Sequence, residues 1–211
     1  MPSRQRAAPS RDAPPTPAVD RILQTTIAAL SRLDPAALTI QQICREAGVT
    51  PPTIYYHFDS KDGLLAAAIE RLVDDWLAVM EATVPRRGDL EETLALAVAG
   101  WEASICLPTR PLAVFAWVTL LSAETSEQSR TALRRARDRS QQVVRDAVVP
   151  YLGDTDDATE LAMVTIDTVI ACALQHQLDG DAAAVRRRLT ALTGVIRAAV
   201  GPCLHDGVPT G

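Results

Sequence analysis

The sequence is poor in the residues that build disulfide frameworks, metal sites and membrane spans. Its four cysteines are widely separated and form no C-x-x-C pair, so we expect buried free thiols at Cys44, Cys106, Cys172 and Cys203. The longest uncharged run, residues 111–123, has 13 residues and is shorter than the roughly 20 apolar residues of a membrane helix. These absences predict no metal, no cofactor and no membrane span.

Signatures of catalysis are missing as well. The chain has three histidines but no glycine-rich phosphate loop, no paired-histidine motif and no G-x-S-x-G. We therefore predict no catalytic residues and a protein that is not an enzyme. Residues 1–17 combine arginine, serine and five prolines without an apolar stretch, which argues against a secretory signal and favours a cytoplasmic location.

The residues that are abundant favour helices. Apolar residues make up 47% of the chain and aromatic residues only 4%, while our count of alanine is 34 of 211. The net charge is −5, which divides into +1 for residues 1–62 and −6 for residues 63–211. An acidic chain of this kind does not coat nucleic acid non-specifically. Among 21 basic residues there is one lysine, Lys61.

Apolar residues at three- and four-residue spacing predict a series of helices. The first runs from Val19 to about Leu33, a fourth from Ser60 to Met80, and later ones cover residues 89–107, 112–124, 125–149, 157–178 and 181–200. Capping boxes, Thr39 with Gln42 and Thr125 with Gln128, mark two helix starts. We predict an all-α protein with a disordered arm (1–17), a three-helix helix-turn-helix domain (18–63), a larger helical ligand-binding and dimerisation domain entered through the fourth helix (64–203), and a loose tail (204–211).

Two short helices between the first and the fourth form the predicted helix-turn-helix. They span Thr39–Ala47 and Thr50–His57, and Gly48 permits the positive φ of the turn between them. Ile54 and Phe58, four residues apart, are the expected buried anchors of the second helix. Its outward side chains would enter a major groove and offer hydroxyls, aromatic edges and an imidazole: Pro51, Pro52, Thr53, Tyr55, Tyr56 and His57.

The same region contains a longer pattern, which reads Leu38-Thr39 … Ile43 … Ala47-Gly48-Val49 … Thr53-Ile54-Tyr55-Tyr56-His57-Phe58 … Ser60-Lys61 … Leu64-Leu65. This pattern resembles the N-terminal domain of the TetR family of transcriptional regulators. The resemblance covers Val19 to about Leu72, roughly a quarter of the chain. It departs from the family at the tandem prolines Pro51 and Pro52, which remove two backbone donors, and at Gly63.

The resemblance implies a role for individual residues in binding DNA. Thr39 would cap its helix and meet a phosphate, Gln41 would touch a base, and Lys61 would meet a phosphate at the start of the fourth helix. Thr50 would join the outward residues of the second helix, with Tyr56 and His57 holding the DNA backbone. In the alternative, the tyrosines and His57 are core residues and Lys61 is a solvated charge.

Other basic residues have two interpretations each. The arginines of the arm, Arg4, Arg6 and Arg11, either follow the DNA phosphates or belong to a segment that is basic for no particular reason. The cluster between residues 130 and 139 is a solvated helix face or a second nucleic-acid surface. Its members are Arg130, Arg134, Arg135, Arg137 and Arg139.

A ligand-responsive regulator also needs a second site. Polar and aromatic residues that could orient a ligand among the later helices are Trp101, Glu102, Arg110, Trp117, Asp167 and His176. The alternative places the tryptophans in the core and the charged residues in salt bridges or on the surface. The last two helices, about 157–178 and 181–200, carry more apolar surface than one small domain buries, and the resemblance implies a homodimer through them.

These observations lead to one functional hypothesis and one rival from another class. The leading hypothesis is a one-component regulator, a repressor by family habit, that binds a pseudo-palindromic operator in double-stranded DNA as a homodimer and is released by a small-molecule effector. The rival is a helical protein that binds a small molecule or a partner and whose helix-turn-helix no longer binds DNA.

Overall fold

The computed structural model describes residues 16–30, 37–83, 89–106 and 126–205, and every regular element within these ranges is an α-helix. The all-α prediction is therefore confirmed. The arm arginines, the predicted helix 112–124, Arg110, Trp117 and the end of the tail lie outside the described residues. The described helices are α1 (Pro17–Leu30), α2 (Ile40–Ala47), α3 (Pro51–Phe58), α4 (Lys61–Thr83), α5 (Leu90–Cys106), α7 (Glu127–Leu152), α8 (Asp156–Asp179) and α9 (Ala182–His205).

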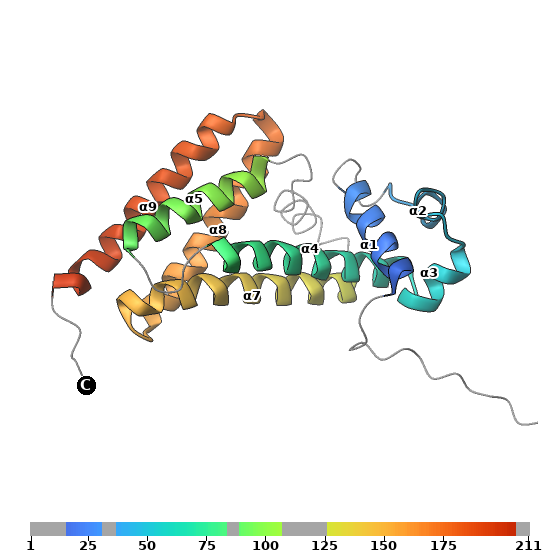
Figure 1. Ribbon diagram of the computed structural model, residues 1–211, viewed down its shortest axis with the longest axis horizontal. Helices are drawn as coiled ribbons and strands as arrows, with labels where there is room; N and C mark the ends of the chain where they lie inside the picture. Colours follow the sequence, from blue (N-terminus) through green and yellow to red (C-terminus); the bar gives the residue numbers. More distant parts are fainter. Residues whose placement is uncertain (1–15, 31–36, 84–88, 107–125, 206–211) are drawn as a thin grey trace, which may run out of the picture.

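The first three helices form a small unit at one end of the molecule (Figure 1). Its centre consists mainly of aliphatic side chains that are almost fully buried, among them Ile22, Ile43 and Ile54. Arg71 of α4 holds α1 in place, because its guanidinium bonds Asp20 of α1 at 2.7 Å and Asp75 of its own helix at 2.8 Å. These carboxylates also raise the pKa of Arg71. The unit therefore rests on the first half of α4.

Helix α4 connects this unit to the rest of the chain. It runs without a break across residues 63 and 64, where the sequence places the domain boundary, and buries Leu64, Ile69 and Trp76 along one face. In Figure 1 it lies beside α7 over most of its length. Two ion pairs join the two helices outside the apolar seam, Glu70 with Arg135 at 3.7 Å and Asp74 with Arg139.

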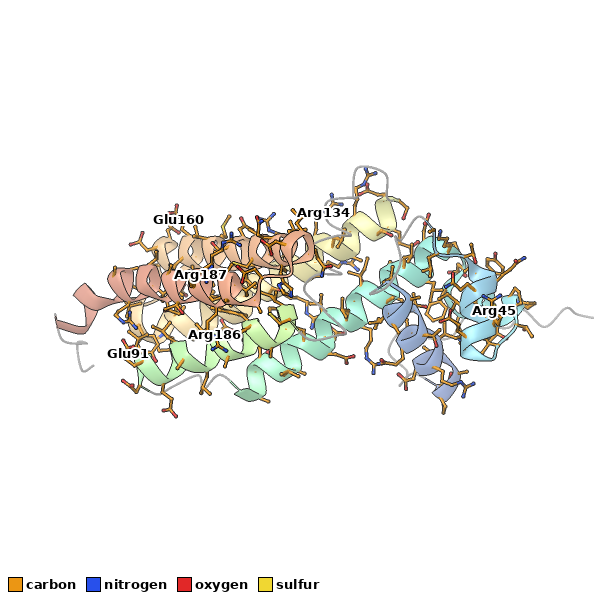
Figure 2. All side chains as sticks on the ribbon, turned by 90° about the horizontal axis from the view of Figure 1, so that it is seen from above. Arg45, Glu91, Arg134, Glu160, Arg186 and Arg187 are labelled. Atoms are coloured by element: carbon orange, nitrogen blue, oxygen red, sulfur yellow. The ribbon has the colours of Figure 1, made fainter. Side chains whose placement is uncertain are left out.

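Helices α5, α8 and α9 pack with the far half of α7 into a larger helical unit, which is called the second domain below. Ile105, Val169 and Leu189 are buried between them. Arg197 of α9 bonds Glu91 of α5 through two contacts of 2.6 Å, and the hydrogen bond lowers the pKa of Glu91. Figure 2 shows Glu91 at the end of the molecule remote from the helix-turn-helix. None of the described helices combines the length and hydropathy needed to cross a bilayer.

Three sequence-based boundaries need correction. Helix α7 is capped by Ser126, whose hydroxyl accepts the N–H of Ser129 at 3.3 Å, rather than by Thr125. It also continues beyond 149 through Pro150 to Leu152, because a proline in the last turn removes only one backbone hydrogen bond. For the same reason α9 extends to His205 across Pro202, where the sequence suggests a turn-rich tail.

The α7 arginines are held by acids of the chain itself. Arg130 and Arg134 bond Glu127 at 3.0 and 2.8 Å, and both lower the pKa of that carboxyl. Arg137 bonds Asp167 of α8 at 2.7 Å. With the pairs of Arg135 and Arg139 to α4, this arrangement supports the interpretation of the cluster as a solvated helix face, and the structure adds that its arginines are ion-paired.

Candidate nucleic-acid interface and effector cavity

The turn between α2 and α3 follows from short-range signals. The Thr39 hydroxyl accepts the N–H of Gln42 at 3.2 Å and caps α2 as predicted. Gly48 ends the helix in the left-handed region, at φ 65° and ψ 40°, and its N–H bonds the Cys44 carbonyl. A Cβ at Gly48 would meet nothing within 4 Å, so the backbone angle alone selects glycine here.

Helix α3 separates a buried face from an exposed one. Ile54 is fully buried and Phe58 is 8% exposed, which confirms them as anchors. Between them, Tyr55 and Tyr56 are 49% and 56% exposed, so the core interpretation of the two tyrosines is wrong. The rings of Tyr56 and His57 meet edge to face at 4.9 Å between centroids, and this contact orients His57, which is half-buried. The tyrosines thus form an aromatic, hydroxyl-bearing surface on a rigid helix.

The first turn of α3 offers side chains rather than backbone donors. Pro51 and Pro52 are exposed and have no N–H, and the N–H of Thr53 is used by the Thr50 carbonyl at 3.0 Å. Thr50 occupies the N-cap position, but its hydroxyl bonds the Thr53 hydroxyl at 3.1 Å instead of a backbone N–H. A phosphate at this helix start would therefore be bound by the two threonine hydroxyls.

Helices α2 and α4 flank this surface. Thr39 and Gln41 are exposed at the start of α2, and Lys61 is half-buried as the first residue of α4. Arg45 is also exposed, one turn after Gln41 on the same face of α2, and projects at the helix-turn-helix end of the molecule in Figure 2. The sequence pattern does not predict a role for Arg45, although its spacing of four residues from Gln41 places both on one face of α2.

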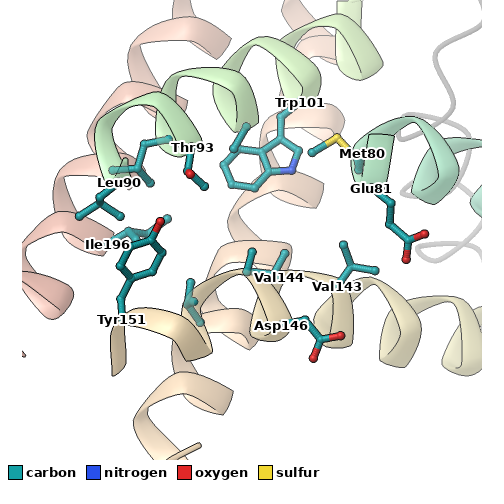
Figure 3. A pocket seen from close by; sticks show the side chains of 14 residues that line it. Met80, Glu81, Leu90, Thr93, Trp101, Val143, Val144, Asp146, Tyr151 and Ile196 are labelled. Carbon is teal, nitrogen blue, oxygen red and sulfur yellow. The ribbon is translucent and has the colours of Figure 1, made fainter. Parts of the chain in front are cut away.

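A cavity of about 70 Å³ lies in the second domain, among α4, α5, α7 and α9. Apolar side chains form most of its wall (Figure 3). Trp101 lies in this wall, together with Thr93 and Ala97, two turns and one turn earlier on the same face of α5. The other lining residues are Met80, Glu81, Leu90, Leu94, Val143, Val144, Asp146, Ala147, Val148, Tyr151 and Ile196.

The other predicted ligand residues that the structure describes do not reach this cavity. Glu102 follows Trp101 but points about 100° away around the helix, where it bonds Arg186 at 2.8 Å. Asp167 is in the surface pair with Arg137, and His176 is buried in the last turn of α8. Within the described ranges no three His, Cys, Asp or Glu side chains gather where they could hold a metal ion.

An open groove follows the outer side of α8 and α9. Val164 and Val195 are 51% and 55% exposed along it, and the remaining lining residues are mostly small: Thr168, Ala171, Cys172, Gln175, Arg188, Ala191 and Leu192. Burial raises the pKa of the Cys172 thiol. The groove thus exposes apolar side chains along both of the last two helices.

The fold and the exposed face of α3 define a helix-turn-helix protein with a larger helical domain behind it. Residues 22–68 match the model of the bacterial regulatory proteins of the tetR family. The helix-turn-helix domain of this chain is therefore similar to that of the tetR family.

Curated relatives and solved structures are similar to the chain as well. The chain is 33% identical over 72 residues to the HTH-type transcriptional regulator BetI 2 of Chromohalobacter salexigens, covering 34% of this chain and 33% of the relative. It is 35% identical over 102 residues to BetI of Rhizobium meliloti, covering 46% and 47%. The chain thus spans a third to about half the length of these curated relatives.

Two solved structures show the same fold over most of the chain. A TetR-family regulator from Agrobacterium tumefaciens has a TM-score of 0.69 at 20% identity and covers 87% of this chain and 97% of its own. A transcriptional regulator from Rhodococcus sp. Rha1 has a TM-score of 0.71 at 22% identity, covering 90% and 99%. At these identities the similarity concerns the fold alone.

Proposed function

We propose that the chain is a one-component transcriptional repressor that binds a pseudo-palindromic operator as a homodimer and releases it when a small molecule fills the cavity of the second domain. The observation that carries the proposal is the exposed face of α3, where Tyr55 and Tyr56 project from a helix fixed by Ile54 and Phe58. Such a helix fits a major groove with its hydroxyls toward bases and phosphates.

The contacts assigned to DNA lie on three helices. Tyr55 and Thr53 would reach bases or phosphates from α3, and Tyr56 with His57 would hold the backbone. From the flanks, Gln41 would reach a base, and the charges of Arg45 and Lys61 would meet phosphates. The remaining members of the interface are Thr39, Thr50, Pro51 and Pro52, with the prolines limited to van der Waals contact because they have no N–H.

Helix α4 runs from the helix-turn-helix to the cavity, and α7 packs beside it, which gives a route for the response. Met80 and Glu81, near the end of α4, line the cavity, whereas the first turn of α4 rests on α3. At that same turn, a Cβ on Gly63 would lie 3.4 Å from Gln128 Nε2 in the first turn of α7. A ligand that separates α4 from α7 at the cavity would therefore tilt the start of α4. Couplings of this kind are typically about 1–3 kcal/mol.

The groove on α8 and α9 supports the homodimer. A two-fold contact between two copies of this groove would bury the exposed Val164 and Val195, and a two-fold dimer presents two recognition helices to a palindromic site. We expect Val195→Asp to convert the dimer to monomer in light-scattering chromatography. Val79→Asp, on α4 and equally exposed at 57%, is the matched control and should stay dimeric. A dimeric Val195→Asp protein would contradict this interface.

The first test is a titration of the purified protein against the DNA that flanks its own gene, at two salt concentrations and with an unrelated duplex for comparison. Selective, salt-weakened binding is the expected result. Tyr55→Ala should lower the operator affinity about tenfold, as loss of one good contact does. Full affinity in Tyr55→Ala would count heavily against the assignment.

A charge-matched pair of variants separates the proposed surface from the α7 cluster. Arg45→Ala should reduce the slope of log affinity against log salt by about 1, because one phosphate contact is lost. Arg134→Ala, which removes an exposed charge paired with Glu127, should leave the slope unchanged. A reduced slope for Arg134→Ala together with an unchanged slope for Arg45→Ala would indicate that the DNA contacts α7 instead. Equal, weak binding to both duplexes would favour a helical ligand-binding protein that no longer reads DNA.

A further inference from the structure

Two buried polar groups face the cavity and have no partner in the part of the chain that the structure describes. Trp101 is 3% exposed and Thr93 is 5% exposed, yet neither Trp101 Nε1 nor Thr93 Oγ1 has a hydrogen-bond partner among the described residues. In Figure 3 the indole nitrogen points along the cavity toward Met80, and the Thr93 hydroxyl faces Tyr151. A buried donor left unpaired is destabilising, and most buried polar groups in proteins are paired.

Another tryptophan in the same domain shows the usual arrangement. Trp76 is 6% exposed, and its Nε1 donates to Ser104 Oγ at 2.9 Å. The two indoles therefore differ in their hydrogen bonding although both are buried. The group that Trp101 lacks must be an acceptor, since an indole N–H donates only. Thr93 can either donate to or accept from the same molecule.

The charges around the cavity restrict the ligand further. The charged side chains that line it are both acidic, Glu81 and Asp146, and no described lining residue is basic. The arginines next in sequence to lining residues are held elsewhere: Arg145 bonds Asp154 and Thr159, and Arg197 bonds Glu91. Because no described lining residue would supply a counter-charge, an anionic ligand in this mainly apolar site is unfavourable.

The volume limits the size of the ligand. The cavity of about 70 Å³ is smaller than the roughly 150 Å³ that accommodates benzene in an apolar protein core. A single-ring ligand therefore fits only if side chains that line the cavity move. Met80 is the most adaptable of them, because its side chain is flexible. It lies against Gly100, where a Cβ would be 2.9 Å from the Met80 sulfur.

We infer that the effector is a small, mainly apolar, non-acidic molecule, about one ring in size, with an oxygen acceptor that binds the N–H of Trp101. This inference rests on the proposed function, because it names the ligand class of the site that the regulator would use. Thr93 bonds the same polar end of the ligand, and the mainly apolar wall, in which no described residue is basic, disfavours carboxylates and phosphates.

Three probes of similar size test the class without DNA: acetophenone, which has a carbonyl acceptor, ethylbenzene, which has none, and benzoate, which is anionic. Calorimetric titration of the full chain should show acetophenone binding at least about fivefold more tightly than ethylbenzene, the ratio expected for one hydrogen bond. Benzoate should bind most weakly. Equal affinity for acetophenone and ethylbenzene, a preference for benzoate, or no binding of any probe at its solubility limit overturns the inference.

Variants test whether the preference for acetophenone over ethylbenzene depends on Trp101 Nε1. Trp101→Phe should abolish the preference for acetophenone while keeping ethylbenzene binding, because the ring remains and the N–H is lost. Thr93→Val should reduce the preference. Trp76→Phe is the matched control and should leave it unchanged, because Trp76 donates to Ser104 and is not part of the cavity wall. An undiminished preference in a folded Trp101→Phe protein, as judged by circular dichroism, would contradict the role of the indole.

The operator titration is measured separately, so the two proposals can fail independently. If the chain binds its operator but shows no preference among the probes, the ligand class is wrong and the regulator stands. If the preference is present but no operator is bound, the cavity assignment stands and the proposed function is wrong.

Discussion

Replacing Gly63 by alanine places helix propensity and tertiary packing in direct opposition. Gly63 is buried in the first turn of α4, and its N–H donates to the Ser60 hydroxyl at 2.9 Å. In an isolated helix, alanine is more favourable than glycine by about 1 kcal/mol. Propensity alone therefore predicts that Gly63→Ala stabilises the protein.

The structure predicts the opposite sign. A Cβ at Gly63 would lie 2.0 Å from the Phe58 carbonyl oxygen and 3.2 Å from its carbon, whereas ordinary contacts begin at 3.4 Å. The backbone would have to move by the difference, 3.4 − 2.0 = 1.4 Å. Phe58 cannot yield freely, because its ring is buried and its carbonyl accepts the N–H of Ser60 at 2.7 Å. Overpacking of this kind costs about 1–3 kcal/mol.

We expect Gly63→Ala to lower the free energy of unfolding by about 1–3 kcal/mol, measured by urea denaturation with an unchanged m-value. Operator affinity should fall as well, because the shift separates α3 from α4. Gly194→Ala is the control: a Cβ there meets nothing within 4 Å, and stability should rise by up to about 1 kcal/mol. Light scattering checks that the control keeps its assembly state. A Gly63→Ala protein as stable as its parent would refute the packing argument.

Three further changes test other contacts. Asp59 has a φ of 63° and ψ of −38°, so Asp59→Gly should relieve strain and raise the stability in urea by about 1 kcal/mol; a loss would contradict this. Ser104→Ala should lower the free energy of thermal unfolding by about 1–3 kcal/mol, because the buried N–H of Trp76 loses its acceptor; an unchanged Tm would argue against the bond. Arg197 lowers the pKa of Glu91, so this pair stabilises the fold above the unfolded-state pKa of about 4.3 and ceases to do so as pH falls through the folded-state value. Glu91→Gln should therefore lower the Tm at neutral pH and have no effect at about pH 2; a Tm difference that persists in acid would contradict the linkage.

Most of the helix-turn-helix could be predicted because its signals are local. The Thr39 cap, the positive φ of Gly48 and the four-residue spacing of Ile54 and Phe58 each act within one or two helical turns. Such signals are written in consecutive residues, and the tertiary structure adds only their common core. The exposure of Tyr55 follows directly from the burial of its neighbours.

The cavity could not be predicted in the same way, since its wall comes from four helices that lie far apart in the sequence. Residue type makes both Trp101 and Glu102 candidates for ligand binding, but Trp101 faces the cavity and Glu102 bonds Arg186. Residue type does not indicate Thr93, although it lies two turns before Trp101 on the same face of α5. Helical periodicity relates residues within a helix and does not tell which neighbour a face meets.

Sequence alone thus determined the helical class, the helix-turn-helix and the side chains that it presents, because backbone angles, caps and short-range apolar spacing act along the chain. Tertiary structure decided which acids hold the α7 arginines and which polar atoms stay unpaired around the cavity. It also decided that Gly63 must lack a Cβ. Those outcomes depend on how closely helices that are distant in sequence approach each other. In a close-packed interior, a change of about one ångström in the distance between two helices decides whether a contact or a clash results.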